Sequence, residues 1–161
     1  MVHRCARTGA HLNDETQLAK VNTDPFNLQR FLDAQAPVID RVLAELRSGQ
    51  KRSHWMWFVF PQIAGLGFSA MAQRYAIASL DEAKAYAAHP VLEPRLKRCT
   101  QTVLDVPGHA IHAIFGSPDD MKFRSSMTLF AKAAADCTLF EDALTRYFDG
   151  EPDQKTLDLL R

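Results

Sequence analysis

The sequence has few cysteines and no apolar segment at its N-terminal end. Its three cysteines, Cys5, Cys99 and Cys137, are widely spaced and odd in number, so a disulfide framework is not expected and a reducing compartment is the default. Residues 1–18 are polar and lack the apolar stretch of a secretory signal. We therefore expect a cytoplasmic protein.

The sequence also lacks an excess of either charge and any long hydrophobic run. Nineteen Lys and Arg residues cancel nineteen Asp and Glu residues, which gives a formal net charge of zero. A nucleic-acid-binding surface normally carries an excess of positive charge, so nucleic acid is the least favoured partner. No segment approaches the ~20 apolar residues that cross a bilayer, and no membrane association is expected.

What is present indicates one folded domain. A length of 161 residues with 47% hydrophobic residues excludes wholesale disorder and is too short for two independent cores. Residues 1–23 carry scattered charges without hydrophobic periodicity, and we interpret them as a loosely attached N-terminal extension. Asp24 and Pro25 then have the pattern of an N-cap followed by a proline in the first turn. We predict that residues 24–161 form a single domain.

Helix start signals recur through this domain. Segments 79–82 and 138–141 each have the spacing of a capping box, in which a hydroxyl and a carboxylate each accept a hydrogen bond from a free backbone N–H. The pair 117–118 is typical of an N-cap before a proline. In segment 68–76, Phe68 begins the apolar stripe of a short amphipathic helix. The sequence therefore predicts an all-α fold, an irregular array of about seven or more short helices around one core.

Segment 55–60 has the composition of a strand, because it consists largely of aromatic and β-branched residues. No second strand-like run is present to pair with it, and an isolated strand leaves its backbone polar groups without partners. Ser53 is a suitable N-cap and Pro61 would end a helix of two turns. We therefore interpret segment 55–60 as a short buried helix, with an extended conformation as the alternative.

Three motifs of the sequence together resemble one bacterial family. They are DPFNLQRF at 24–31, KRSHWMWFVFPQ at 51–62 with GLG at 65–67, and FGSPDD at 115–120 with KFRSSMTLF at 122–130. The chain is similar in them to domain-of-unknown-function family 1810, whose members are often automatically named calpastatin. The resemblance implies an all-helical single domain and supplies no activity. The inhibitor of that name is disordered and repetitive, which is the physical opposite of a chain with 47% hydrophobic residues.

The densest group of chemically versatile side chains lies within the second of these motifs. Two cations and an imidazole stand beside two indoles and an amide, and such groups can hold an anion and stack on a planar ring. The simpler interpretation is that the indoles fill the core, since large aromatic side chains are usually buried. The predicted ligand-binding residues of this segment are Lys51, Arg52, His54, Trp55, Trp57 and Gln62.

A second candidate group lies near the predicted start of a later helix. Arg124 can contact a ligand there, or it can pair with Asp120 at i, i+4 in a purely structural role. Ser125 and Ser126 are poor helix formers, so either close helix packing or a ligand would explain their presence. We add Arg124 and Ser125 to the predicted ligand-binding residues.

Two further patterns carry weaker signals. Gly65, Gly67 and Ser69 would allow a backbone to approach a ligand closely, although an ordinary turn explains them as well. His109 and His112 have an i, i+3 spacing that suits a metal ion on one helix face, but no third ligand accompanies them. We therefore expect no metal and no cofactor, and the sequence assigns no catalytic residue.

Two functions from different classes are compatible with these observations. The first is binding of, or catalysis on, a small anionic and nucleotide-like ligand at the candidate residues. The second is a protein-interaction module without catalytic activity, which predicts a large exposed apolar patch. Enzymatic activity, the oligomeric state and the identity of a protein partner stay open at this point.

Overall fold

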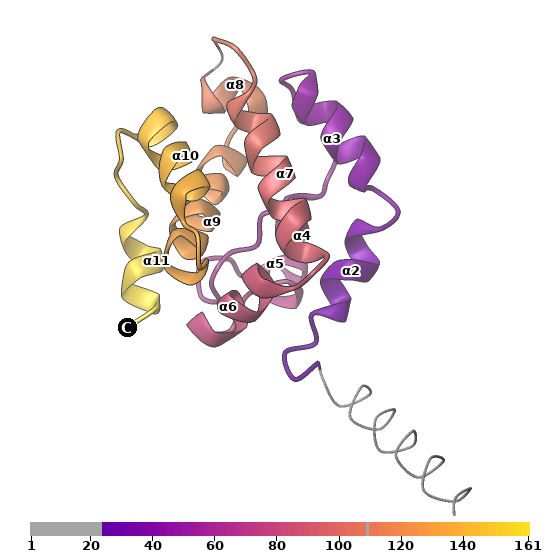
Figure 1. Ribbon diagram of the computed structural model, residues 1–161, viewed down its shortest axis with the longest axis vertical. Coiled ribbons are helices and arrows are strands. Elements are labelled where there is room, and N and C mark those ends of the chain that lie inside the picture. Colours follow the sequence, from indigo (N-terminus) through magenta and orange to yellow (C-terminus); the bar gives the residue numbers. More distant parts are fainter. Residues whose placement is uncertain (1–23, 109) are drawn as a thin grey trace, which may run out of the picture.

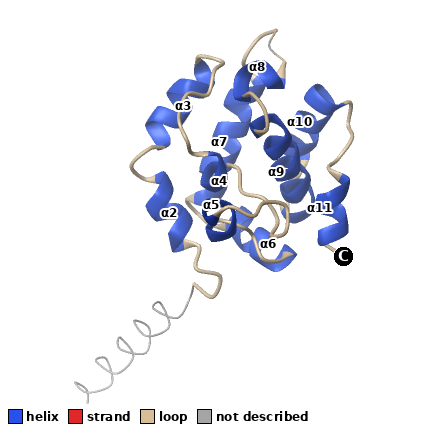
Figure 2. Cartoon of the chain, turned by 180° about the vertical axis from the view of Figure 1, so that it is seen from behind, coloured by secondary structure: helices blue, strands red, loops and turns tan. Residues whose placement is uncertain are grey.

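The computed structural model describes residues 24–108 and 110–161 (Figure 1). Within these ranges the chain forms ten helices and no strand (Figure 2), which confirms the predicted all-α array of short helices. No described helix is both long and apolar enough to cross a bilayer. The predicted extension 1–23, which includes Cys5, and also His109 lie outside the described residues.

Most of the helices span only one to three turns. They are, in chain order, α2 (Gln29–Gln35), α3 (Ile39–Arg47), α4 (Met56–Val59), α5 (Ala70–Arg74), α6 (Leu80–Ala88), α7 (Leu92–Leu104), α8 (Ile111–Phe115), α9 (Asp119–Ala133), α10 (Thr138–Phe148) and α11 (Gln154–Leu159). Helices of this length are not stable alone in water, so tertiary packing must hold them in place.

Helix α9 supplies the centre of that packing. It contacts α6, α8, α10 and α11, as can be followed in Figure 1, and buried side chains cover more than one of its faces. The fully buried ring of Phe123 lies 5.1 Å from the ring of Phe60 and 5.1 Å from that of Phe115. These aromatic contacts fix the chain after α4 and the end of α8 against α9.

The start of α6 follows the predicted capping box. The Ser79 hydroxyl accepts a hydrogen bond from the Glu82 N–H at 3.2 Å. The Glu82 carboxylate accepts one from the Ala78 N–H at 2.8 Å, one residue before the N-cap itself. The same carboxylate lies 3.3 Å from Arg30 of α2, so this cap also joins two helices.

Other predicted helix starts differ from the structure by one to four residues. Thr138 is already the first residue of α10, because the Asp136 carboxylate accepts a hydrogen bond from the Thr138 N–H at 3.1 Å. The capping box predicted for 138–141 is therefore wrong. Pro118 is the N-cap of α9 and not its first residue. Asp24 does accept hydrogen bonds, but from the Leu28 and Gln29 N–H groups, so α2 begins only at Gln29.

The segment 55–60 is helical, but for one turn only. Helix α4 covers Met56–Val59, and Trp55 takes the N-cap position expected for Ser53. The physical reason is that the Ser53 hydroxyl donates a hydrogen bond to the carboxylate of Glu45 at 2.6 Å. That bond draws the chain before α4 towards α3 and delays the start of the helix.

Candidate functional site

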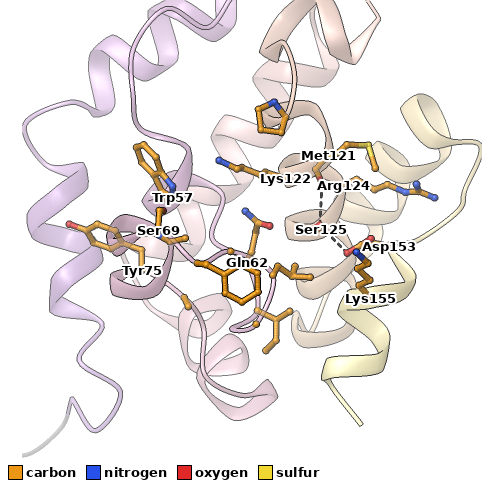
Figure 3. Close-up of a pocket in the computed structure, with 18 of the residues that line it drawn as sticks. Trp57, Gln62, Ser69, Tyr75, Met121, Lys122, Arg124, Ser125, Asp153 and Lys155 are labelled. Atoms are coloured by element: carbon orange, nitrogen blue, oxygen red, sulfur yellow. Dashed lines mark hydrogen bonds between the residues drawn. The ribbon is translucent and has the colours of Figure 1, made fainter.

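An open pocket of about 920 Å³ lies between three parts of the chain (Figure 3). The first part runs from Trp57 of α4 through the connection to α5 and on to Ala76, and the second is the first half of α9 with Pro118. The third is the segment 151–155, which leads into α11. The pocket therefore exists only in the folded chain, because its walls are far apart in the sequence.

The connection from α4 to α5 is held at both ends. The Ala64 N–H donates to the Ile77 carbonyl and the Ile77 N–H donates to the Gln62 carbonyl, both at 2.8 Å. This short parallel bridge fixes the backbone of Gln62 while its side chain extends into the pocket (Figure 3). The Gln62 amide makes no hydrogen bond with another described residue, so its donors and acceptor are available to a ligand.

Between these ends, the chain turns tightly at two glycines. Gly65 has a φ of +106°, a backbone conformation that residues with a side chain rarely adopt. At Gly67 there is no room for a side chain, because a Cβ atom there would lie 2.7 Å from the Ala72 Cβ atom. The Ser69 hydroxyl then caps α5 by accepting a hydrogen bond from the Ala72 N–H at 3.1 Å. The glycine pattern thus serves a turn, and this turn lies on the pocket wall.

Helix α9 contributes Lys122 and Ser125 to the opposite wall. The Lys122 ammonium lies 5.3 Å from the centre of the Trp57 ring and 3.4 Å from an oxygen of Asp119. The Ser125 hydroxyl lies 3.1 Å from the Met121 carbonyl and 2.9 Å from the Asp153 carboxylate, as the dashed lines of Figure 3 show. Ser125 therefore joins α9 to the segment that leads into α11.

Asp153 organises that segment with one of its two carboxylate oxygens. Its Oδ2 atom accepts hydrogen bonds from Ser125, from the Thr156 hydroxyl at 2.6 Å and from the Thr156 N–H at 3.3 Å. Its backbone N–H donates to the Thr128 hydroxyl at 2.8 Å. These bonds cap α11 and fix the third wall of the pocket on α9.

Arg124 is oriented by the same segment and not by its own helix. Its Nε donates to the Glu151 carbonyl at 3.0 Å, and its guanidinium lies 3.7 Å from the Glu151 carboxylate. The pair with Asp120 that the i, i+4 spacing suggested does not form, because the Asp120 carboxylate lies 3.2 Å from His112. Arg124 thus stands at the rim of the pocket beside an exposed acid.

Positive charge exceeds negative charge among the residues that line the pocket. Lys122, Arg124 and Lys155 face two carboxylates, those of Glu151 and Asp153. Lys155 is exposed and forms no ion pair within the described part of the chain. The pocket therefore offers an unpaired ammonium group to an anion.

Four of the eight predicted site residues line this pocket, and four do not. Trp57, Gln62, Arg124 and Ser125 come together there from α4, the connection after it and α9. The four residues that the structure places elsewhere are Lys51, Arg52, His54 and Trp55.

Trp55 and Arg52 belong to a separate cluster around a carboxylate of α3. The Trp55 side chain is 1% exposed and its indole N–H donates to Glu45 at 3.3 Å. The N–H groups of Arg52 and Ser53 and the Ser53 hydroxyl also donate to Glu45. Burial alone would raise the pKa of Glu45, but these hydrogen bonds outweigh burial and hold that pKa below its ordinary value. The indole of Trp55 is thus a core side chain with no ring face open to a ligand.

Lys51 and His54 also lie outside the pocket. The Lys51 ammonium pairs with Asp119 at 2.9 Å and lies 5.2 Å from the centre of the Trp55 ring, and its side chain is only 9% exposed. His54 is exposed at the surface, like Arg52. The basic residues of this motif therefore do not converge on one anion.

Phe68 is a pocket residue that the sequence pattern misplaced. The apolar stripe predicted for 68–76 puts Phe68 on a buried helix face, whereas α5 begins only at Ala70 and Phe68 is 82% exposed. The Ser69 cap, which marks the helix start one residue later, is the sequence signal that places Phe68 before the helix. Met121, Asp153 and Lys155 had no distinguishing signal, because each belongs to an ordinary helix start.

The described residues contain no group of three or more His, Cys, Asp or Glu side chains arranged to hold a metal ion. His112 approaches Asp120, as noted above, and its predicted companion His109 lies outside the described ranges. The pocket is lined by side-chain donors such as Gln62 and Lys122 and by the aromatic residues Trp57, Phe68 and Tyr75.

Comparisons with known proteins add fold but no activity. The sequence family described as "Protein of unknown function (DUF1810)" matches residues 25–160. A crystal structure of the conserved hypothetical protein Rv1873 from Mycobacterium tuberculosis is similar, with 55% sequence identity and a TM-score of 0.84 over 85% of this chain and 98% of that chain. No curated protein matches the sequence.

Proposed function

The chain belongs to the DUF1810 family of proteins of unknown function, and from that premise we propose that it binds a small anionic, nucleotide-like ligand in the pocket. One observation carries the proposal. Trp57, Gln62, Arg124 and Ser125 were predicted as ligand-binding residues from their chemistry, and they line one open pocket although they lie in separate segments.

The size and the internal layout of the pocket support a ligand of nucleotide dimensions. Its volume of about 920 Å³ falls within the ~300–1,000 Å³ of typical small-molecule sites. In Figure 3, Trp57 and Tyr75 lie on one side, Asp153 and Lys155 lie on the other, and Gln62 projects between them. The pocket thus combines aromatic surface with two ammonium groups, that of Lys122 beside Trp57 and that of Lys155 on the other side, and these groups suit a ligand that has both a planar ring and an anionic group.

The charges favour an anion beside the lysines of the pocket. Lys155 is unpaired among the described residues, and Lys122 is shared between the Trp57 ring and Asp119. A phosphate would gain charge-assisted hydrogen bonds from such ammonium groups. Arg124 would have to exchange its contact with the exposed Glu151 for the ligand, so we assign the primary anion contacts to the two lysines.

Thermal unfolding in the presence of defined probes tests the proposal. Adenosine 5′-monophosphate, ribose 5-phosphate, adenosine and inorganic phosphate are each titrated into the protein. At 100 times its Kd, a ligand of the native state adds about 2.7 kcal/mol of stability, which corresponds to a rise in Tm of roughly 6–12 °C for a domain of this size. The proposal fails if none of the phosphate-bearing probes raises Tm.

A protein-interaction module without catalytic activity is the second candidate. It is favoured by two exposed apolar side chains beside the pocket, Phe68 at 82% and Met121 at 47% exposure. An exposed apolar patch at a surface commonly marks a contact with another protein. Analytical ultracentrifugation of the full chain over a hundredfold concentration range tests the simplest form of this candidate, in which the chain associates with itself.

A further inference from the structure

Most of the large exposed apolar side chains in the described part of the chain lie in or next to the pocket. Within the described residues, four large hydrophobic side chains are exposed: Phe68, Val91, Met121 and Leu159. Phe68 and Met121 line the pocket, and Leu159, which does not line it, packs next to the pocket residue Gly65. Single exposed apolar residues are ordinary on a protein surface, but their concentration at one hollow is a feature of binding sites.

Phe68 differs from the other aromatic residues of the pocket in having a free ring. Trp57 has the Lys122 ammonium 5.3 Å from its ring centre. Tyr75 is buried, and its ring packs against those of Phe31 at 5.9 Å and Phe58 at 5.3 Å. No described ring or cation lies against Phe68, which leaves both of its faces available for stacking.

The backbone at Phe68 is fixed although its side chain is not. The Phe68 carbonyl accepts a hydrogen bond from the Gln73 side chain at 3.0 Å, and the next residue, Ser69, caps α5. On the other side, the turn at Gly65 and Gly67 brings the chain to this place. An aromatic side chain on a fixed backbone has only two torsions to order, so its immobilisation on a ligand costs little entropy.

We propose that Phe68 is a ligand-binding residue that stacks on the planar ring of the ligand, so that the pocket selects phosphates that carry such a ring over phosphates that do not. This inference rests on the proposed function and names the group that recognises the ring. The lysines of the pocket hold the phosphate, and Phe68 adds affinity only when a ring is attached to it. Phe68 therefore determines specificity more than it contributes to binding of the anion.

Isothermal titration calorimetry with two probes tests this division. Adenosine 5′-monophosphate carries the ring and ribose 5-phosphate does not. We expect Phe68→Ala to weaken binding of adenosine 5′-monophosphate by about 5- to 150-fold, the range found when a base loses an aromatic partner, and to leave the Kd of ribose 5-phosphate unchanged. Phe68→Tyr keeps the ring and should keep the affinity. Val91→Ala, which alters an exposed apolar residue outside the pocket lining, should change neither Kd.

The outcomes separate this inference from the proposed function. If the wild-type protein binds both probes equally well, or Phe68→Ala weakens both equally, the stacking role is wrong while the anion site stands. If the wild-type protein binds neither probe, the proposed function fails and the inference fails with it. If Phe68→Ala instead abolishes self-association of the chain in ultracentrifugation, Phe68 is a contact between copies and the stacking role is overturned.

Discussion

Trp55 and Trp57 are two residues apart and have opposite surroundings. Trp55 is 1% exposed and its N–H is bonded to Glu45, whereas Trp57 is half-buried and lines the pocket. Trp55 is the N-cap of α4 and Trp57 is its second residue, and side chains two residues apart on a helix do not face the same way. A single sequence motif therefore serves two purposes, one that holds the fold together and one that forms a recess in its surface.

The polar groups around Trp55 and those in the pocket also differ, because the first have partners within the chain and some of the second do not. Around Glu45, every carboxylate contact is made by the chain itself, with donors from Arg52, Ser53 and Trp55. In the pocket, Gln62 and Lys155 have no such partners among the described residues. A cluster of buried polar groups that all have hydrogen-bond partners stabilises a structure. Polar groups without partners at a pocket can instead form hydrogen bonds with a ligand. This contrast separates the structural cluster around Glu45 from the proposed ligand-binding residues, which residue type alone does not.

The largest effect should come from removing the buried indole. Trp55→Ala leaves a cavity in the core and unpairs the Glu45 cluster, and we expect the free energy of unfolding to fall by about 3–5 kcal/mol. Trp57→Ala, its matched control, should cost clearly less because part of that side chain already faces solvent. Urea denaturation of both variants measures the difference. Equal losses of stability would contradict the assignment of Trp55 to the core and of Trp57 to the pocket wall.

A smaller loss is expected at the carboxylate itself. Glu45→Gln replaces a charged acceptor of several hydrogen bonds, and we expect it to cost about 1–3 kcal/mol. The folded state lowers the pKa of Glu45 below its ordinary value of 4.5. The stabilisation is therefore present above pH 4.5 and is lost as the pH falls through the folded pKa.

The pH dependence of that variant provides its control. The difference in unfolding free energy between the wild-type protein and Glu45→Gln should be full at pH 7 and shrink below pH 4.5, where Glu45 becomes protonated in the unfolded and then the folded chain. A difference that stays constant from pH 7 to pH 3 would show that the charge of Glu45 does not stabilise the fold. Denaturation series at fixed ionic strength measure it.

The smallest effect on stability, and a selective effect on binding, should come from Lys122, which shares Asp119 with the more deeply buried Lys51. Lys122 lines the pocket and Lys51 does not. Lys122→Met keeps the aliphatic stem and removes the charge, and we expect it to weaken binding of ribose 5-phosphate by about tenfold, the equivalent of one charge-assisted hydrogen bond. Lys51→Met should leave that Kd unchanged. If Lys51→Met loses more affinity for ribose 5-phosphate than Lys122→Met does, the anion binds beside Lys51 and not in the pocket.

The helical class of the fold could be predicted because it depends on local patterns. Apolar periodicity and the Ser79 cap act within a few residues, and the structure has a helix where they indicate one. The exact starts depended on competing local acceptors. Helix α10 begins one residue earlier than predicted because the Asp136 carboxylate accepts a hydrogen bond from the Thr138 N–H. Ser53 does not cap α4 because its hydroxyl donates a hydrogen bond to Glu45 of α3. The second of these is a tertiary contact, which no pattern within the segment contains.

The candidate site could be predicted in part for the same reason. Trp57 and Gln62 have the chemistry of binding residues, and so do Trp55 and Arg52, so residue type did not separate them. The direction in which each side chain points follows from where a one-turn helix begins. Phe68 was assigned to a buried face because its apolar spacing fits a helix, whereas the Ser69 cap leaves it before that helix.

The most direct test of the central claim uses the two indole N–H signals of the protein. In a nitrogen–proton correlation spectrum, Trp57→Phe assigns which signal belongs to which tryptophan, and adenosine 5′-monophosphate is then titrated into the wild-type protein. We predict that the Trp57 indole signal shifts saturably while the Trp55 signal, bonded to Glu45, stays in place. Binding of the nucleotide in this pocket is contradicted if neither signal moves, or if the Trp55 signal shifts and the Trp57 signal does not.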